Sequence, residues 1–435
     1  MYLFLLLILL ILLLQLSLIM TKVDLTAPCN VYLMIYVMAC TFAALNYKQW
    51  EFDMGFNTFA ILLIGAVIFF CVSLVIRPNE TARIQSKEKI SEINISKIFV
   101  IAMCVLDFVM ILLTYIELCR LLMGSVFTTD IFTLFYRYRV FAVVNSEYNL
   151  PGYIVYVSKV PEVASYILAY SYINNIFISK TNARKYRYYI WPTIFEIARI
   201  LESGARLGVI NVLIGIFVCA YGFFWRDKGA SSNIKKIFKY TGFALLGMIL
   251  FYYMAIVLGR SVESFSIVEY ISVYTGAPLR NLDLFLSDNV LKSEIFGEET
   301  FYYLNHSLGK RGIIKVPNNY TVHMETMRAN GHYLGNTYTA FRRWFKDFGY
   351  SGVFILQFGF ASFYNILYKK ITDSFYQRSI MTYFYLYYSF PLFLHFFDDM
   401  LYRNIFSFAS IIYIFLFFVF YKLLIRNKIR LRLRR

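Results

Sequence analysis

Long runs of apolar residues, separated by short polar connections, dominate the chain. About eleven windows have roughly 20 apolar residues each, the length that an α-helix needs to cross the hydrocarbon core of a bilayer. The pattern therefore predicts an all-α polytopic membrane protein with about eleven, and in any case roughly 10–12, transmembrane helices. The predicted helices lie at 2–20, 28–46, 57–76, 98–121, 153–178, 188–203, 207–225, 240–258, 350–368, 379–396 and 405–424.

Basic residues divide unevenly between the two sets of connections that these helices create. The tail 426–435 is strongly basic, so we place it in the cytoplasm, and an odd number of spans then places the N-terminus outside. The connections on the side of the tail, together with the tail, hold 24 Lys and Arg, whereas the short connections on the other side hold 5. Cytoplasmic connections of membrane proteins collect Lys and Arg, so this contrast supports the orientation. The predicted cytoplasmic connections are 21–27, 77–97, 180–187, 226–239 and 369–378.

One late connection is much longer than the others and divides the chain into three parts. Residues 1–258 hold the first eight predicted helices, 259–349 form a long loop outside the membrane, and 350–435 hold the last three helices and the basic tail. Loops of this length usually carry function. Within it, 264–286 predicts one or two short amphipathic helices, broken near Gly276 and Pro278. Another outer connection mixes apolar and basic residues over 131–140, as in a helix that lies on the membrane surface.

The composition agrees with a membrane protein and excludes an ordinary soluble enzyme. Hydrophobic residues make up 59% of the chain, charged residues only 16%, and the mean hydropathy is +0.58. The net charge of +17 would favour nucleic acid as a partner of a soluble protein, but here we attribute it to topology, and no nucleic-acid partner is expected. The six cysteines all fall in apolar runs, so we expect neither a disulfide framework nor a zinc site.

Several chemistries lack their usual sequence motifs. The chain has no Walker A sequence, no Asp-x-Asp, no H-E-x-x-H and no G-x-S-x-G. Three of the four histidines fall in the long outer loop. We therefore expect no nucleotide substrate, no metal site and no cofactor.

Four charged residues recur at helical spacing in a predicted span. Glu196, Arg199, Glu202 and Arg206 are three or four residues apart, so they share one helix face. The face is either a self-neutralising stripe between helices or one wall of a water-filled cavity, with Arg206 at its outer mouth. Other charges near spans are Asp107, expected to hydrogen-bond between helices, Glu117 and Arg120, expected to pair near the outer interface, and Lys159 and Glu162, which could line a cavity.

Arginines gather near the outer boundary of the membrane. Guanidinium groups bind phosphate oxygens in bidentate fashion, and a lipid diphosphate places its head at this depth. Two or three converging arginines could hold such a head and stabilise it as a leaving group. The alternative is that they pair with Glu263, Asp283 or Asp347. The arginines are Arg206, Arg260, Arg280, Arg328, Arg342 and Arg343.

Two stretches of the chain resemble a known family. The first is Glu202-Ser203-Gly204-Ala205-Arg206-Leu207-Gly208, which opens an apolar run. The second is Gly335-Asn336-Thr337-Tyr338-Thr339-Ala340-Phe341, followed by Asp347-Phe348-Gly349-Tyr350-Ser351-Gly352. With the order of spans and the long late outer loop, they resemble the oligosaccharide repeat-unit polymerases of the Wzy type, which make O-antigen and capsule chains. The resemblance covers about residues 188–370, and the rest of the chain only by hydropathy.

The resemblance implies a fold like that of the GT-C-like membrane glycosyltransferases that use lipid-linked sugars, and a location in the bacterial inner membrane. The implied reaction is metal-independent glycosyl transfer between two undecaprenyl-diphosphate-linked oligosaccharides at the outer face of that membrane. Expected partners are this donor and acceptor, membrane lipids and a chain-length regulator protein. One alternative is an O-antigen ligase, which is disfavoured because the related ligases carry a histidine near the position where Asn336 stands in this chain. The others are a polysaccharide flippase or other secondary transporter, and a non-catalytic assembly protein.

Residue roles follow from this implied reaction. Arg206, Arg260, Arg280 and Arg342 would bind the diphosphate. His332 is the first candidate for the general base, with Glu325 and His323 as runners-up. Asn336 and Tyr338, like Arg342, would contact sugar or phosphate, or else anchor the loop. Asp347 is expected to cap the incoming helix, and Gly349 and Gly352 to form a small-residue packing face.

Overall fold

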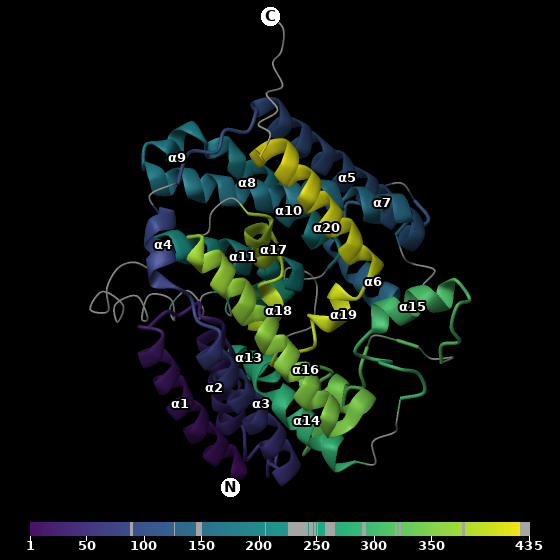
Figure 1. The fold of residues 1–435 in the computed structure, drawn as a ribbon. Coiled ribbons are helices and arrows are strands. Elements are labelled where there is room, and N and C mark those ends of the chain that lie inside the picture. Colours follow the sequence, from purple (N-terminus) through teal and green to yellow (C-terminus); the bar gives the residue numbers. More distant parts are fainter. Residues whose placement is uncertain are drawn as a thin grey trace, which may run out of the picture.

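The computed structural model is mostly helical (Figure 1). It describes residues 1–87, 90–125, 127–144, 150–204, 206–224, 251–256, 266–288, 293–317, 320–321, 323–375 and 379–426, with 242, 247 and 249 as single positions. The first half contains α1 (Tyr2–Met20), α2 (Pro28–Leu45), α3 (Phe56–Val75), α4 (Glu80–Lys87), α5 (Lys97–Met123), α6 (Ile131–Val144), α7 (Gly152–Val157), α8 (Lys159–Ile178), α9 (Asn182–Lys185), the 3₁₀ turn η2 (Arg187–Ile190), α10 (Trp191–Glu202) and α11 (Arg206–Phe224). The second half contains α13 (Ile267–Thr275), α14 (Ala277–Ser287), α15 (Tyr302–Lys310), β1 (Met327–Ala329), β2 (His332–Gly335), α16 (Ala340–Asp373), α17 (Ile380–Tyr387), α18 (Phe390–Phe393), α19 (Tyr402–Ile405), α20 (Phe408–Phe420) and the π-helical turn η4 (Tyr421–Arg426).

Seven helical segments among the described residues are long and apolar enough to cross a membrane. They are α1, α2, α3, α5, α11, α16, and α20 together with η4 (Phe408–Arg426). The expected class, a helical protein with several membrane-spanning helices, agrees with the structure.

Four of the predicted spans have no counterpart among these seven segments. The window 153–178 is divided at Ser158 into α7 and α8. In 188–203, a 3₁₀ turn precedes α10, which has only 12 residues. The window 379–396 contains the short helices α17 and α18, and Pro391 lies at the start of α18, where its missing N–H costs nothing. Most of 240–258 lies outside the described residues.

Both stretches that the sequence predicts as helical within the outer connections are helical in the structure. The surface segment around 131–140 forms α6, and 264–286 forms α13 and α14, which meet at Gly276. The structure adds one short antiparallel hairpin, formed by β1 and β2, which the sequence analysis did not predict. Its turn is Asn330-Gly331, with φ of 47° and 75°, and Asn-Gly is the strongest short hairpin signal in a sequence.

Helix α16 packs against α2 and α3 on one side and α17 on the other, and so joins the two groups of helices seen in Figure 1. Its contact with α3 is close: a Cβ added at Gly65 would lie 2.4 Å from the ring of Phe341. At the same residue of α3, Gln357 Nε2 donates to the carbonyl oxygen of Gly65 at 2.9 Å. The start of α16 is thereby fixed on the bundle.

The described parts of the connections predicted to be cytoplasmic meet at one end of the bundle, which we call the basic end. The predicted connection 226–239 and the tail beyond residue 426 lie outside the described residues. There Tyr368 Oη donates to Asp24 Oδ2 at 2.7 Å, and the backbone N–H of Asn79 donates to Asp373 at the C-terminal end of α16. We call the opposite end the loop end, because the described parts of the segment 266–339 lie there. The N-terminal amine lies 3.6 Å from Asp53 at this end. The two predicted sets of connections are therefore separated in space.

Candidate functional site

Helices α13 and α14 are fixed to the bundle at the loop end. A Cβ added at Gly276, between them, would lie 2.6 Å from the backbone nitrogen of Ala43 in α2, so only glycine fits this approach. On α14, Asp283 Oδ1 accepts hydrogen bonds from the backbone N–H of Gly55 at 2.8 Å and from Thr58 Oγ1 at 2.7 Å. Helices α13 and α14 are therefore packed firmly against the bundle.

The hairpin and the residues after it are held by two buried polar side chains. Asn281 Nδ2 donates to the carbonyl oxygens of Leu334 and Thr337, at 3.2 and 2.9 Å. Tyr338, fully buried, donates its hydroxyl to the carbonyl oxygen of Glu325 at 3.1 Å. Tyr338 thus anchors the segment 323–326, one of the two roles that the sequence left open for it.

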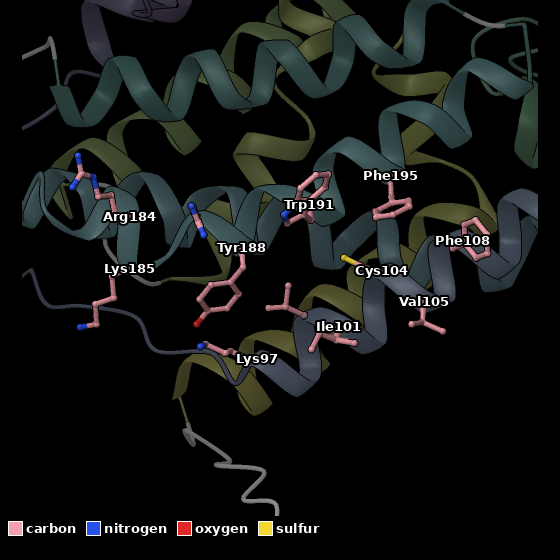
Figure 2. A pocket seen from close by; sticks show the side chains of 12 residues that line it. Lys97, Ile101, Cys104, Val105, Phe108, Arg184, Lys185, Tyr188, Trp191 and Phe195 are labelled. Atoms are coloured by element: carbon pink, nitrogen blue, oxygen red, sulfur yellow. The ribbon is translucent and has the colours of Figure 1, made fainter.

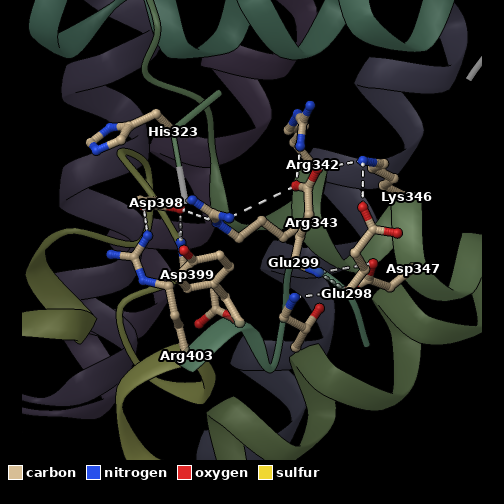
Figure 3. A network of polar contacts seen from close by, with 12 residues as sticks. Glu298, Glu299, His323, Arg342, Arg343, Lys346, Asp347, Asp398, Asp399 and Arg403 are labelled. Carbon is tan, nitrogen blue, oxygen red and sulfur yellow. Dashed lines mark hydrogen bonds and ion pairs between the residues drawn. The ribbon is translucent and has the colours of Figure 1, made fainter. Parts of the chain in front are cut away.

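A network of charged side chains, most of them largely buried, connects the first turns of α16 to the loop segment (Figure 3). Arg342 pairs with Glu299, and its Nη2 donates to both carboxylate oxygens of Glu325, at 2.8 and 2.9 Å. Lys346 Nζ lies 2.8 Å from Glu299. Burial alone would raise the pKa of Glu299, but Arg342, Arg343 and Lys346 together lower it below its usual value. The carboxylate is therefore charged and holds the loop against α16.

Asp398 lies at the other side of this network and is shared by two arginines. Arg343 Nε donates to Asp398 Oδ1 at 2.6 Å, and Arg403 Nη1 donates to Asp398 Oδ2 at 2.6 Å. Burial opposes the charged carboxylate, but Arg343 and then Arg403 lower the pKa of Asp398 to about 2. Its neighbour Asp399 accepts from Trp344 Nε1 at 2.8 Å. The turn 397–404 is thereby bound to α16.

The prediction that Asp347 caps its own helix is wrong. Asp347 lies inside α16 and accepts hydrogen bonds from Ser293 Oγ at 2.6 Å and from the backbone N–H groups of Glu299 and Thr300, the latter at 2.7 Å. It therefore orders the loop that precedes α15.

The packing role predicted for Gly349 and Gly352 is also not what the structure describes. Gly349 has φ 64° and ψ −154°, and it marks a kink within α16. This backbone region is essentially restricted to glycine. At Gly352, an added Cβ would lie 2.1 Å from Phe348 Cβ, one turn earlier. Both glycines serve the kink that turns the polar start of α16 into its apolar part.

Arg206 stands apart from this network and is surrounded by aromatic rings. It is 3% exposed, its guanidinium lies 3.9 Å from the ring centroid of Phe251, and the rings of Tyr270 and Tyr274 lie at 5.7 and 5.6 Å. Its Nη1 donates to the carbonyl oxygen of Phe251 at 2.8 Å. Within the described part of the chain, no carboxylate pairs with it. Among the described residues, Arg206 is therefore a buried cation whose partners are aromatic rings, a carbonyl oxygen and the hydroxyl of Tyr274.

The turn before Arg206 requires a glycine. Gly204 has φ 62°, and a Cβ there would lie 2.8 Å from the carbonyl oxygen of Phe135 and 3.0 Å from Arg139 Cβ, both in α6. The surface helix α6 thus crosses the turn that opens α11. This contact connects the first motif of the resemblance to the loop end.

A chain of contacts connects Arg206 to the charge network. Tyr274 approaches Arg206 through its hydroxyl at 3.4 Å, and its ring stacks on that of Phe397 with centroids 6.4 Å apart. Phe397 directly precedes Asp398, which Arg343 binds. The two motifs of the resemblance therefore meet at the same end of the bundle.

Part of the charged face of α10 is self-neutralising, which is one of the two interpretations that the sequence left open. Glu196 and Arg199 pair at 2.6 Å, and Glu162 lies 3.5 Å from Arg199, so these three neutralise one another. Glu202 belongs to no ion pair within the described residues, and its Oε2 is buried without a hydrogen-bond partner there.

The other predicted charges near spans also have partners of their own, with one exception. Glu117 and Arg120 pair at 3.0 Å, as expected. Lys159 and Glu162 both contact the hydroxyl of Tyr413, at 3.1 and 2.7 Å. Asp107 was expected to hydrogen-bond between helices, but its carboxylate is buried with no such bond among the described residues.

The predicted diphosphate-binding arginines lie in separate surroundings. Arg280 pairs with Asp283 at 2.9 Å, which is the alternative that the sequence left open, and Arg342 is bound by two glutamates. Arg206 lies in its aromatic surroundings, and Arg260 and Glu263 lie outside the described residues. Asn336 is exposed after the hairpin.

The three candidates for the general base also lie in different surroundings. His332 lies in β2, where it faces Ala329 of β1. Glu325 is engaged by Arg342. His323 lies beside Asp398 (Figure 3), and burial, together with Arg139, Arg403 and Arg343, lowers its pKa below the usual value of 6.5. His323 is therefore a neutral imidazole next to the charge network.

The sequence analysis missed Asp398 and its two arginines as one unit. Three charged residues follow a predicted span within a few positions: Asp398, Asp399 and Arg403. Such a cluster at the end of a span could have predicted a charged site there. Nothing in the sequence indicated that Arg343, 55 residues earlier, would reach Asp398.

Comparisons with protein-family models, with curated proteins and with solved structures found no match for this chain.

Proposed function

We propose that this protein is a polymerase that joins polyprenyl-diphosphate-linked oligosaccharide repeat units at the outer face of the bacterial inner membrane. The proposal rests on the two motif segments, Ser203–Arg206 and 335–352, which resemble those of the Wzy-type polymerases. Their proximity at the loop end, through Tyr274 and Phe397, supports a shared site.

Arg206 is the observation that carries the proposal. Burying a cation without a carboxylate is costly, and Arg342, Arg343 and Arg403 all avoid that cost through ion pairs. Within the described residues, Arg206 has aromatic rings, a carbonyl oxygen and the hydroxyl of Tyr274 as partners, and none of them carries a negative charge. A diphosphate that replaced the Phe251 carbonyl oxygen as acceptor would gain a charge-assisted bond in surroundings of low polarity.

The reaction needs a bound leaving group and a proton acceptor. A hydroxyl oxygen of one lipid-linked unit attacks the anomeric carbon of the growing glycan, and the bond from that carbon to the diphosphate oxygen breaks. Arg206 stabilises the negative charge that develops on the departing diphosphate. The hydroxyl proton passes to a base, for which His323 is the best-placed of the three candidates, because it is neutral and borders the network.

The charge network has a positioning role in this proposal. Its cations Arg342, Arg343, Lys346 and Arg403 are matched by Glu298, Glu299, Glu325 and Asp398. Such a network binds the loop segment, α16 and the turn 397–404 into one rigid body. His323, on that segment, is thereby held in place without a metal ion or cofactor being invoked.

Reconstitution tests the function directly. The purified protein in liposomes, supplied with a defined undecaprenyl-diphosphate-linked repeat unit, should produce a ladder of longer glycans on the lipid carrier. Transfer only to a lipid A core acceptor would instead identify a ligase. Movement of the unchanged unit across the bilayer would identify a transporter, and either result would overturn the proposal.

A further inference from the structure

A groove begins at the basic end, and none of its lining residues belongs to the site proposed above. It has a volume of about 670 Å³ and lies between α5 and the segment of α9, η2 and α10 (Figure 2). Arg184 and Lys185 lie at one end, and Phe195, Val105 and Phe108 lie toward the other (Figure 2). The groove therefore has a basic part and an apolar part.

The basic part of the groove carries four cations and no carboxylate among its lining residues. They are Lys97, Arg184, Lys185 and Arg187. Lys185 pairs with Glu92 at 3.0 Å, outside the lining, and Lys97 lies 5.6 Å from the ring of Tyr188. Arg184 and Arg187 are exposed and form no ion pair within the described residues. Their positive charge is thus free to meet an anion.

The apolar part follows a helix that can cross a membrane. Ile101, Val105 and Phe108 of α5 are half exposed or more, at 61%, 55% and 50%, and face outward from the bundle. Trp191, at the junction of the two parts, is 55% exposed. Tryptophan and tyrosine favour the boundary between lipid chains and head groups. The basic part of the groove thus suits a lipid head group, and its apolar part suits an acyl chain.

We propose that this groove binds one anionic phospholipid from the leaflet at the basic end. The phosphate contacts Arg184 and Arg187, and an acyl chain lies along Ile101, Val105 and Phe108. Charge complementarity decides the occupant: four cations on a lipid-facing rim attract a phosphate head group, and basic pockets between membrane helices on the cytoplasmic side bind such heads. The zwitterionic choline head adds a positive charge, which the same rim repels.

Native mass spectrometry of the full-length protein in detergent tests this inference. Dioleoyl-phosphatidylglycerol should bind more tightly than dioleoyl-phosphatidylcholine, which has the same chains. The double variant Arg184→Gln/Arg187→Gln should weaken phosphatidylglycerol binding by about 30-fold and leave phosphatidylcholine nearly unchanged. Ile101→Trp, which fills the apolar part without altering charge, should weaken both lipids.

Lys369→Gln/Lys370→Gln is the matched control, because it removes two exposed positive charges at the same end outside the groove. It should keep tight phosphatidylglycerol binding. Equal binding of the two lipids, or equal loss in the control, would overturn the inference. Displacement of phosphatidylglycerol by undecaprenyl phosphate at much lower concentration would assign the groove to the carrier lipid instead, and a dimer that buries the groove would assign it to a second copy.

Discussion

Asp398 shows how single residues hold the loop end together. It accepts hydrogen bonds from Arg343 and Arg403, and it lies next to His323. A carboxylate buried between two guanidiniums is stable only while both partners remain, because each charge compensates for the desolvation of the other. Its contribution is therefore mainly geometric: it fixes the turn 397–404 relative to α16.

Replacing Asp398 with asparagine should destabilise the protein. Asp398→Asn keeps the shape but leaves Arg343 and Arg403 without their shared carboxylate, so the free energy of unfolding should fall by about 3–5 kcal/mol. Thermal unfolding in detergent measures the effect. Asp288→Asn, at an exposed position after α14 at the same end of the bundle, should change stability by less than about 0.5 kcal/mol. Equal effects of the two variants would show that the charge network does not stabilise the protein.

His323 predicts a pH dependence of glycan transfer. Its pKa is lowered below 6.5 by burial and by Arg139, Arg403 and Arg343, so the neutral base form persists at pH 7 and is lost only as the pH falls below that value. His323→Gln should slow transfer by about 10²–10⁴-fold and abolish the acidic limb of the rate profile. His306→Gln should keep that limb. An unchanged rate in His323→Gln would move the base role to Glu325 or His332.

At the scale of elements, hydropathy predicted the long apolar helices but not the breaks. The windows 2–20, 28–46 and 57–76 agree with α1, α2 and α3 within about two residues at each end, a difference within the ambiguity of helix boundaries. The window 379–396 was wrong because apolar composition persists through Ser389 and Pro391, where the helix stops. The pattern of apolar residues indicates which segments are buried or face lipid. The breaks in the helices depend on local backbone geometry, which that pattern does not show.

The kink in α16 is a second such case. From the spacing of Gly349 and Gly352 we predicted a packing role for Gly349. The spacing of glycines can be read from a sequence, whereas the backbone angle φ of Gly349 cannot. Gly349→Ala should destabilise the protein by about 1–3 kcal/mol, since alanine disfavours φ 64° with ψ −154°. Unfolding in detergent measures this effect. Ser351→Ala, two residues on and exposed, serves as the control, and a neutral Gly349→Ala would show that the kink is not required.

At the scale of the molecule, two ends of different charge are separated by apolar helices. Long-range pairs such as Asp24 with Tyr368 could not be derived from the sequence, because hydropathy specifies which segments span but not which neighbours they choose. The division of Lys and Arg, in contrast, was visible from the start. For the candidate site, the sequence indicated the end of the molecule at which it lies, but not which residues meet there.

The orientation gives a prediction of its own. In a variant without its native cysteines, Arg328→Cys at the loop end should react with a membrane-impermeant maleimide from the periplasmic side. Lys370→Cys, at the basic end, should react only after the inner membrane is permeabilised. Both positions are exposed. Labelling of both from one side would contradict the arrangement.

The central claim is that Arg206 binds the diphosphate of the lipid-linked substrate. The most direct measurement is glycan chain growth by the reconstituted protein, compared between Arg206→Ala and Arg328→Ala, which removes an exposed arginine at the same end. The account predicts that Arg206→Ala loses at least about 100-fold in rate, as expected when a donor to a developing negative charge is removed, while Arg328→Ala keeps a near-normal ladder. A normal ladder from folded Arg206→Ala would contradict the account.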